Sequence, residues 1–124
     1  MNKIDRRGLL GLVVLVAAVA GANQWWTART QASLGEEVAA LARPGDIRMV
    51  SSTICPYCSV ARQWLRAHQV PFDECFIEKD AACAAHYEAM RAPGTPVVLV
   101  RGQPQLGFDA QRVREALRRS SPSG

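Results

Sequence analysis

The sequence has no internal repeat and no low-complexity tract, and its 124 residues leave room for one compact domain. It also lacks a stripe of basic residues. The formal net charge is +4, but Lys3, Arg6 and Arg7 lie together at the N-terminus, and without this N-terminal cluster and Asp5 the chain has 12 basic and 10 acidic residues. The other arginines are interspersed with acids, so we expect no nucleic-acid partner.

One apolar run lies near the N-terminus, and no other segment is long enough to enclose it as a buried core helix. Residues 9–22 follow the basic cluster and precede a polar pair, which is the layout of an export signal. Small residues at 20–22 offer a cleavage site, whereas Trp25 and Trp26 suit a helix that stays anchored at the membrane interface. Both alternatives predict a periplasmic or other extracytoplasmic location, the second with residues 8–26 as a tether to the inner membrane.

After this segment, Ser33 and Glu36 have the spacing of a capping box, and Pro44 is a helix breaker. We therefore predict a linker that ends in a short helix. The predicted organisation is an export signal or membrane anchor over residues 1–26, this linker over 27–45, one domain over 46–119 and a flexible tail over 120–124.

Within the domain, hydrophobic periodicity alternates between strand and helix. Strands are expected at 47–51, 70–78, 97–100 and 105–108, and helices at 56–68, 81–91 and 110–119, the last two capped by Asp80 and Asp109. The order is strand, helix, strand, helix, strand, strand, helix. This is an α/β layout with one parallel pair and a closing hairpin.

Two of the four cysteines, Cys55 and Cys58, lie two residues apart where the first domain helix begins. Unpaired N–H groups and the helix dipole stabilise a thiolate there, so we expect Cys55 to have a lowered pKa and to act as the nucleophile. Cys58, one turn further along, would be the less exposed resolving thiol. Pro56 suits the first helical turn because it has no N–H to leave unpaired.

A C-x-x-C pair also occurs in zinc sites and soft-metal clamps. Cys75 and Cys83 do not have the spacing of a second zinc knuckle, so we predict no metal site. A carrier of copper(I) stays open as an alternative function.

The segment from Ile47 to Arg119 resembles the glutaredoxin family and, more broadly, the thioredoxin-like fold. The resemblance rests on Cys55-Pro56-Tyr57-Cys58, on Gly94-Thr95-Pro96-Val97 and on Gly107-Phe108-Asp109. It implies a four-stranded mixed sheet flanked by helices, and thiol-disulfide oxidoreductase activity with no bound cofactor beyond a redox-active disulfide. It also implies that Pro96 is cis beside Cys55, and that substrate contacts come from Tyr57, Thr95, Pro96, Gly107, Phe108 and Asp109.

Several positions depart from the family pattern. Ser52 stands where glutaredoxins usually have a cation, Leu106 where they have glycine, and Ala110 where they have a second acid. Because those groups help to hold the carboxylates of glutathione, we expect protein dithiols and disulfides as the main substrates, with glutathione as a possible co-substrate. A monomer is expected.

The other two cysteines, Cys75 and Cys83, have two interpretations. In an oxidising compartment they form a structural disulfide between the second strand and the second domain helix. Alternatively, they form a second redox pair that relays electrons. Cys83 shares a helix face with Tyr87 and Met90, which favours burial and low reactivity.

Overall fold

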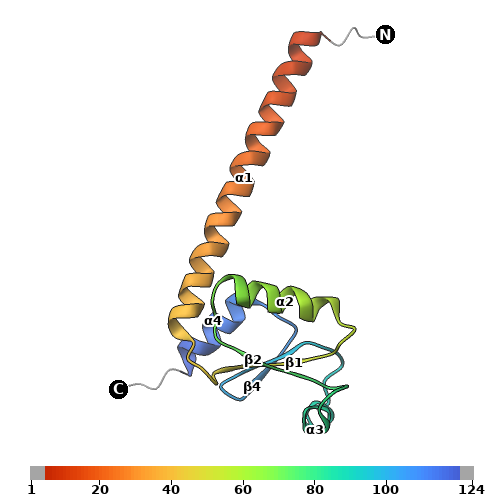
Figure 1. Ribbon diagram of the computed structural model, residues 1–124. Coiled ribbons are helices and arrows are strands. Elements are labelled where there is room, and N and C mark those ends of the chain that lie inside the picture. The colour runs from red at the N-terminus through yellow and green to blue at the C-terminus, as the bar shows by residue number, and fades with distance from the viewer. Residues whose placement is uncertain (1–4, 121–124) are drawn as a thin grey trace. The chain divides into compact units, whose positions relative to one another are not determined.

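The computed structural model describes residues 5–120. Its elements follow the predicted order after a long N-terminal helix (Figure 1). They are α1 (Arg6–Leu41), β1 (Ile47–Ser51), α2 (Pro56–Ala67), β2 (Asp73–Phe76), α3 (Ala81–Ala89), β3 (Val97–Val100), β4 (Gln103–Leu106) and α4 (Ala110–Arg119).

The four strands form one sheet in the order β2-β1-β3-β4. β1 pairs in parallel with β2, with Val50 opposite Cys75, and antiparallel with β3, where Met49 lies opposite Val98. The β3–β4 hairpin is antiparallel. The mixed sheet confirms the predicted fold class, although β2 is shorter than the predicted strand and β4 begins two residues earlier, at Gln103.

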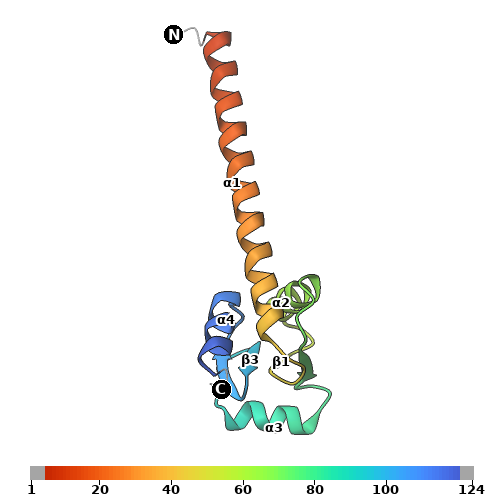
Figure 2. The same cartoon turned by 90° about the vertical axis from the view of Figure 1, so that its left-hand side faces the viewer.

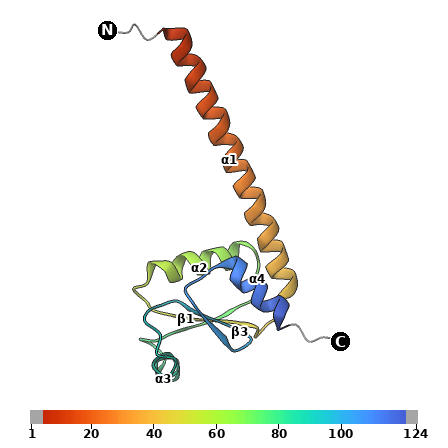
Figure 3. The same ribbon diagram turned by 180° about the vertical axis from the view of Figure 1, so that it is seen from behind.

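Helices cover both faces of this sheet. α2 and α4 lie on one face and α3 on the other (Figures 1 and 3). Successive strand residues point to opposite faces, so Met49 belongs to the core under α2 and α4, and Val50 to a second core beside α3. β3 contributes to both cores, which explains why all four of its residues are buried.

The linker prediction is wrong in one respect. Residues 27–41 are not a separate short helix but the last part of α1, and Ser33 lies inside that helix. No proline or glycine interrupts residues 23–33, so no helix breaker ends the helix there. The hydroxyls of Thr27 and Thr30 donate to the carbonyls four residues earlier, within the helix.

The domain consequently begins earlier than residue 46. By its contacts the chain divides into Met1–Ser33 and Leu34–Gly124. Leu34, Val38 and Ala42 are buried in the core with α2 and α4. Gly35 faces His68 so closely that a Cβ at this position would overlap the imidazole ring.

The first unit contains the apolar run. Its large side chains from Leu9 to Val19, and Trp25 and Trp26, are exposed. Among the residues that the structure describes, α1 is the one helix long and apolar enough to cross a membrane, a property that signal sequences share. Residues 1–4, which include Lys3 of the predicted signal, and 121–124 of the predicted tail lie outside the described residues.

Arg101 joins the two ends of the second unit. Its backbone N–H donates to the carbonyl of Asp46, and its guanidinium donates to the carbonyl of Leu117 and to the Asp46 carboxylate. Burial alone would raise the pKa of Asp46, but hydrogen bonds from the Arg43 N–H and from Arg101 outweigh it, so the pKa lies below its ordinary value of 3.8.

Candidate active site

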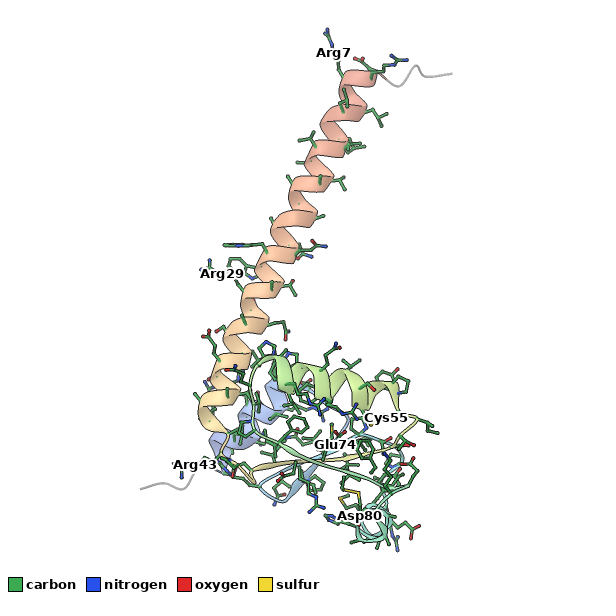
Figure 4. The ribbon with its side chains drawn as sticks, in the orientation of Figure 1. Arg7, Arg29, Arg43, Cys55, Glu74 and Asp80 are labelled. Carbon is green, nitrogen blue, oxygen red and sulfur yellow. A yellow bond between two sulfur atoms is a disulfide. The ribbon has the colours of Figure 1, made fainter. Side chains whose placement is uncertain are left out.

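Cys55 is the N-cap residue of α2, and Pro56 opens the helix (Figure 4). The Sγ of Cys55 accepts a hydrogen bond of 3.1 Å from the backbone N–H of Cys58. An unpaired amide of the first helical turn therefore points at this sulfur, as anion stabilisation at a helix N-terminus requires. The fixed φ of Pro56 and its missing N–H suit this position.

Cys55 and Cys58 are joined in a disulfide, with their Cα atoms 5.3 Å apart. Their exposure differs. Cys58 is fully buried, whereas Cys55 is partly exposed. An incoming thiol can therefore reach Cys55 from solvent, while Cys58 is reached through Cys55.

The peptide bond between Thr95 and Pro96 is cis, in agreement with the resemblance. The carbonyl oxygen of Thr95 lies 3.4 Å from the Sγ of Cys55. Pro96 is fully buried, and its carbonyl accepts from the N–H of Gly107 over 2.8 Å. These contacts hold the start of β3 and the end of β4 beside the disulfide.

A groove of about 470 Å³ runs beside this point. It brings together five of the six predicted substrate-binding residues: Tyr57, Thr95, Pro96, Gly107 and Phe108. Asp109, the sixth, does not line it. Its carboxylate instead caps α4 by accepting from the N–H groups of Gln111 and Arg112.

The groove is also lined by residues that the sequence did not predict as substrate-binding, among them Val60, Leu106 and Arg112. Val60 is 62% exposed, because the face of α2 that turns to the core carries Ala61 and Leu65. Arg112 lies one turn into α4, and its guanidinium donates to the carbonyl of Leu106. In the sequence, the spacing of three residues between Asp109 and Arg112 is the signal that would have indicated a role for Arg112 near this site.

The groove and its rim are largely apolar. Tyr57 and Leu106, which line the groove, are exposed, and Ile54, next to Cys55 in the chain, is 87% exposed, although aliphatic side chains of this size are usually buried. Phe108 is partly buried against Trp64, with ring centroids 5.4 Å apart. Apolar exposure concentrated around a reactive disulfide marks a surface suited to bind another molecule.

The loop before Cys55 is bonded to Glu78. The hydroxyl of Ser52 donates to one carboxylate oxygen of Glu78, and the backbone N–H of Thr53 donates to the other over 3.1 Å. The hydrogen bond from Ser52 is the main reason why the pKa of Glu78 lies below its ordinary value of 4.5.

A second ionic group ties α2 to the sheet. The guanidinium of Arg62 binds both carboxylate oxygens of Glu74 at 2.7 Å, and the buried Ser51 hydroxyl donates to the same carboxylate. Burial opposes ionisation of Glu74, but these bonds outweigh it and lower its pKa below 4.5. The carboxylate is thereby fully engaged and is not a free base.

Cys75 of β2 and Cys83 of α3 form a second disulfide, with Cα atoms 6.1 Å apart. Cys83 is almost fully buried, and both cysteines belong to the core beside α3, on the opposite face of the sheet from α2. Figure 2 shows α3 lying along this face. Within residues 5–120, no three potential metal-binding side chains of His, Cys, Asp or Glu gather at one place.

Comparison with known proteins agrees with this geometry. The glutaredoxin family model matches residues 47–104. The crystal structure of a mutant of the thioredoxin-like protein BC3987 is similar, with 24% identity and a TM-score of 0.53 over 60% of this chain and 96% of that one. A mutated buckwheat glutaredoxin has 14% identity and a TM-score of 0.50 over 75% of this chain and 96% of its own. No curated protein sequence matches significantly.

The family-model match and the cysteine pair thus indicate a thiol-disulfide oxidoreductase, and the structural neighbour shows a thioredoxin-like fold. Over residues 47–104 the domain is similar to the glutaredoxin family.

Proposed function

We propose that this protein exchanges disulfides with protein substrates outside the cytoplasm, with Cys55 as the nucleophile and Cys58 as the resolving thiol. The observation that carries the proposal is the position of the Cys55 sulfur. It caps α2, accepts the N–H of Cys58 and lies 3.4 Å from the carbonyl of Thr95 at the edge of an apolar groove.

In the reducing direction, the thiolate of Cys55 attacks one sulfur of a substrate disulfide. A mixed disulfide forms, and the other substrate sulfur leaves as a thiolate. The Cys58 thiolate then attacks the Sγ of Cys55, which releases the second substrate sulfur and closes the Cys55–Cys58 disulfide. Two electrons pass from the cysteine pair to the substrate, and the reverse steps oxidise a substrate dithiol.

The groove favours protein substrates over glutathione. Its walls include the apolar side chains of Val60, Leu106 and Phe108, which can cover the side chains that flank a cysteine in a peptide. Ser52, at the position where the family usually has a cation, donates its hydroxyl to Glu78 and offers no positive charge to a glutathione carboxylate.

A glutathione-dependent reaction is the second candidate, and Arg112 is the observation that favours it. This guanidinium lines the groove beside Gly107 and Phe108, where it can pair with a carboxylate. In that case glutathione would resolve the mixed disulfide on Cys55 in place of Cys58.

The proposed location is supported by α1. Its exposed apolar stretch has the length and composition of a membrane span, and basic residues precede it, so it supports an anchor or an export signal with the domain on the extracytoplasmic side. In an oxidising compartment the buried Cys75–Cys83 disulfide would be structural.

The test replaces Cys58 by Ala in the full-length chain in its native membrane. We expect Cys55 to accumulate mixed disulfides with proteins, because the second attack is lost, and a Cys55→Ala/Cys58→Ala control to form none. Mass spectrometry of the trapped species decides between the candidates. A glutathione adduct as the dominant species would favour the glutathione-dependent enzyme, and stoichiometric copper on a wild-type protein without disulfide-exchange activity would favour the metal carrier.

A further inference from the structure

Glu78, which lies outside the groove, holds the loop that carries Cys55. Both of its carboxylate oxygens accept hydrogen bonds from this loop, one from the Ser52 hydroxyl and one from the Thr53 N–H. The loop is also closed on itself, because the N–H of Cys55 donates to the carbonyl of Ser52 over 3.3 Å. The carboxylate of a residue between β2 and α3 is therefore hydrogen-bonded to the loop that precedes the reactive sulfur.

This carboxylate is charged and close to Cys55. Its pKa is lowered, so it is ionised at neutral pH, and the residue is exposed to solvent. Thr53 precedes Cys55 by two residues, which span at most about 7 Å, so the charge lies within roughly 10 Å of Cys55. That distance is about one Debye length at 0.1 M salt, which leaves the interaction partly unscreened.

The neighbouring cations have other partners. The ammonium of Lys79, which offsets part of the charge, lies over the ring of Phe76 at 5.2 Å from its centroid. Arg62, which lies over the same ring, is paired with Glu74. The Glu78 carboxylate, in contrast, is hydrogen-bonded to Ser52 and Thr53 of the Cys55 loop.

We propose that Glu78 is a specificity-determining residue that disfavours anionic thiols at Cys55 and favours neutral or cationic peptide cysteines. The inference rests on the proposed exchange at Cys55 and specifies its substrate class. As an incoming thiolate attacks the Sγ of Cys55, the bond to Cys58 breaks and the Cys58 sulfur leaves as a thiolate that takes up a proton. A thiol with a net negative charge meets repulsion from Glu78 during this approach, whereas a cationic thiol meets attraction.

The test uses the oxidised full-length chain in mild detergent and measures how fast two small thiols open the Cys55–Cys58 disulfide. Glutathione is the anionic probe and cysteamine the cationic one. A unit charge acting over roughly 10 Å in water predicts that Glu78→Gln raises the ratio of the glutathione rate to the cysteamine rate about threefold at low salt. At 1 M salt the wild type and Glu78→Gln should give the same ratio, because screening removes the effect of the Glu78 charge in the wild type.

Two further variants separate charge from loop geometry. Asp73→Asn removes an exposed carboxylate at the start of β2, beside Arg48 of β1 and at the opposite end of the strand from the turn that carries Glu78, and should leave the ratio unchanged. Glu78→Asp keeps the charge and should keep the ratio near that of the wild type, even where the shorter side chain slows both thiols.

An unchanged ratio in Glu78→Gln, or an equal loss of rate with both thiols at every salt concentration, would overturn the specificity role. Reaction with dithiothreitol provides the separate check on the proposed function. If dithiothreitol opens the Cys55–Cys58 disulfide but the ratio of the glutathione rate to the cysteamine rate does not depend on residue 78, this inference alone is refuted. A protein in which none of the three thiols opens that disulfide refutes the exchange chemistry as well.

Discussion

The Cys75–Cys83 disulfide is the feature whose removal has the most direct effect on stability. α3 has a single fully buried residue, Cys83, and Tyr87 packs against the same core, so this bond is a covalent part of a small attachment to the sheet. Replacing both cysteines by Ala removes a cross-link between residues separated by eight positions. Loop-closure entropy for a loop of that length predicts a loss of about 2.5 kcal/mol in the free energy of unfolding, and lost sulfur packing adds to it.

The assay is urea unfolding of the full-length chain in mild detergent, monitored by far-UV circular dichroism, for the oxidised wild type and the double variant. The expected result is a lower unfolding midpoint for the variant. Below the transition, we expect the variant to open and close its Cys55–Cys58 disulfide at close to the wild-type rate, because the second disulfide lies on the other face of the sheet.

Two results would refute this reasoning. An unchanged midpoint would show that α3 is held by other contacts. A normal single reaction at Cys55 combined with lost multiple turnover would show that Cys75 and Cys83 relay electrons, which is the alternative that the sequence left open.

Two other changes test the packing and the ionic contacts of the same domain. Gly35→Ala should destabilise it by about 1–3 kcal/mol, because the new Cβ overlaps His68, and this cost exceeds the gain from the better helix propensity of Ala. In thermal unfolding, adding His68→Ala to the same chain should recover part of the lost stability. The pKa of Glu74 is lower in the folded protein than its ordinary 4.5, so its contribution to stability is present above that pH and is lost as the pH falls through the folded value. Acid titration of unfolding free energy should therefore show a shallower decline below pH 4.5 for Glu74→Gln, and an identical slope in both proteins would contradict the ion-pair argument.

Much of the domain was predictable because its signals are local. Asp80 and Asp109 cap the helices that they were expected to cap, and β3 is an uninterrupted apolar run that both layers bury. The cysteine pair at the start of α2 follows from Pro56 and the helical periodicity after it. Each of these depends on a few neighbouring residues and on no distant contact.

The features that the sequence did not predict depend on contacts between distant segments. The continuation of α1 past Ser33 is stabilised by packing of Leu34 and Val38 against helices that come later in the chain. The capping-box spacing at Ser33 and Glu36 carries no information about that packing. Likewise, Glu78 reaches the Cys55 loop across the parallel pairing of β1 and β2, which places residues about 25 positions apart side by side.

The core under α2 and α4 has a consequence for how this chain can be synthesised and cut. Val38 near the start of the domain and Val113 near its end are buried in the same cluster, and Glu37 pairs with Arg114 across it at 3.3 Å. The cluster is therefore incomplete until the last helix has left the ribosome. A fragment shortened at either end exposes the same apolar wall, so we expect truncation from both directions to produce equally aggregation-prone proteins.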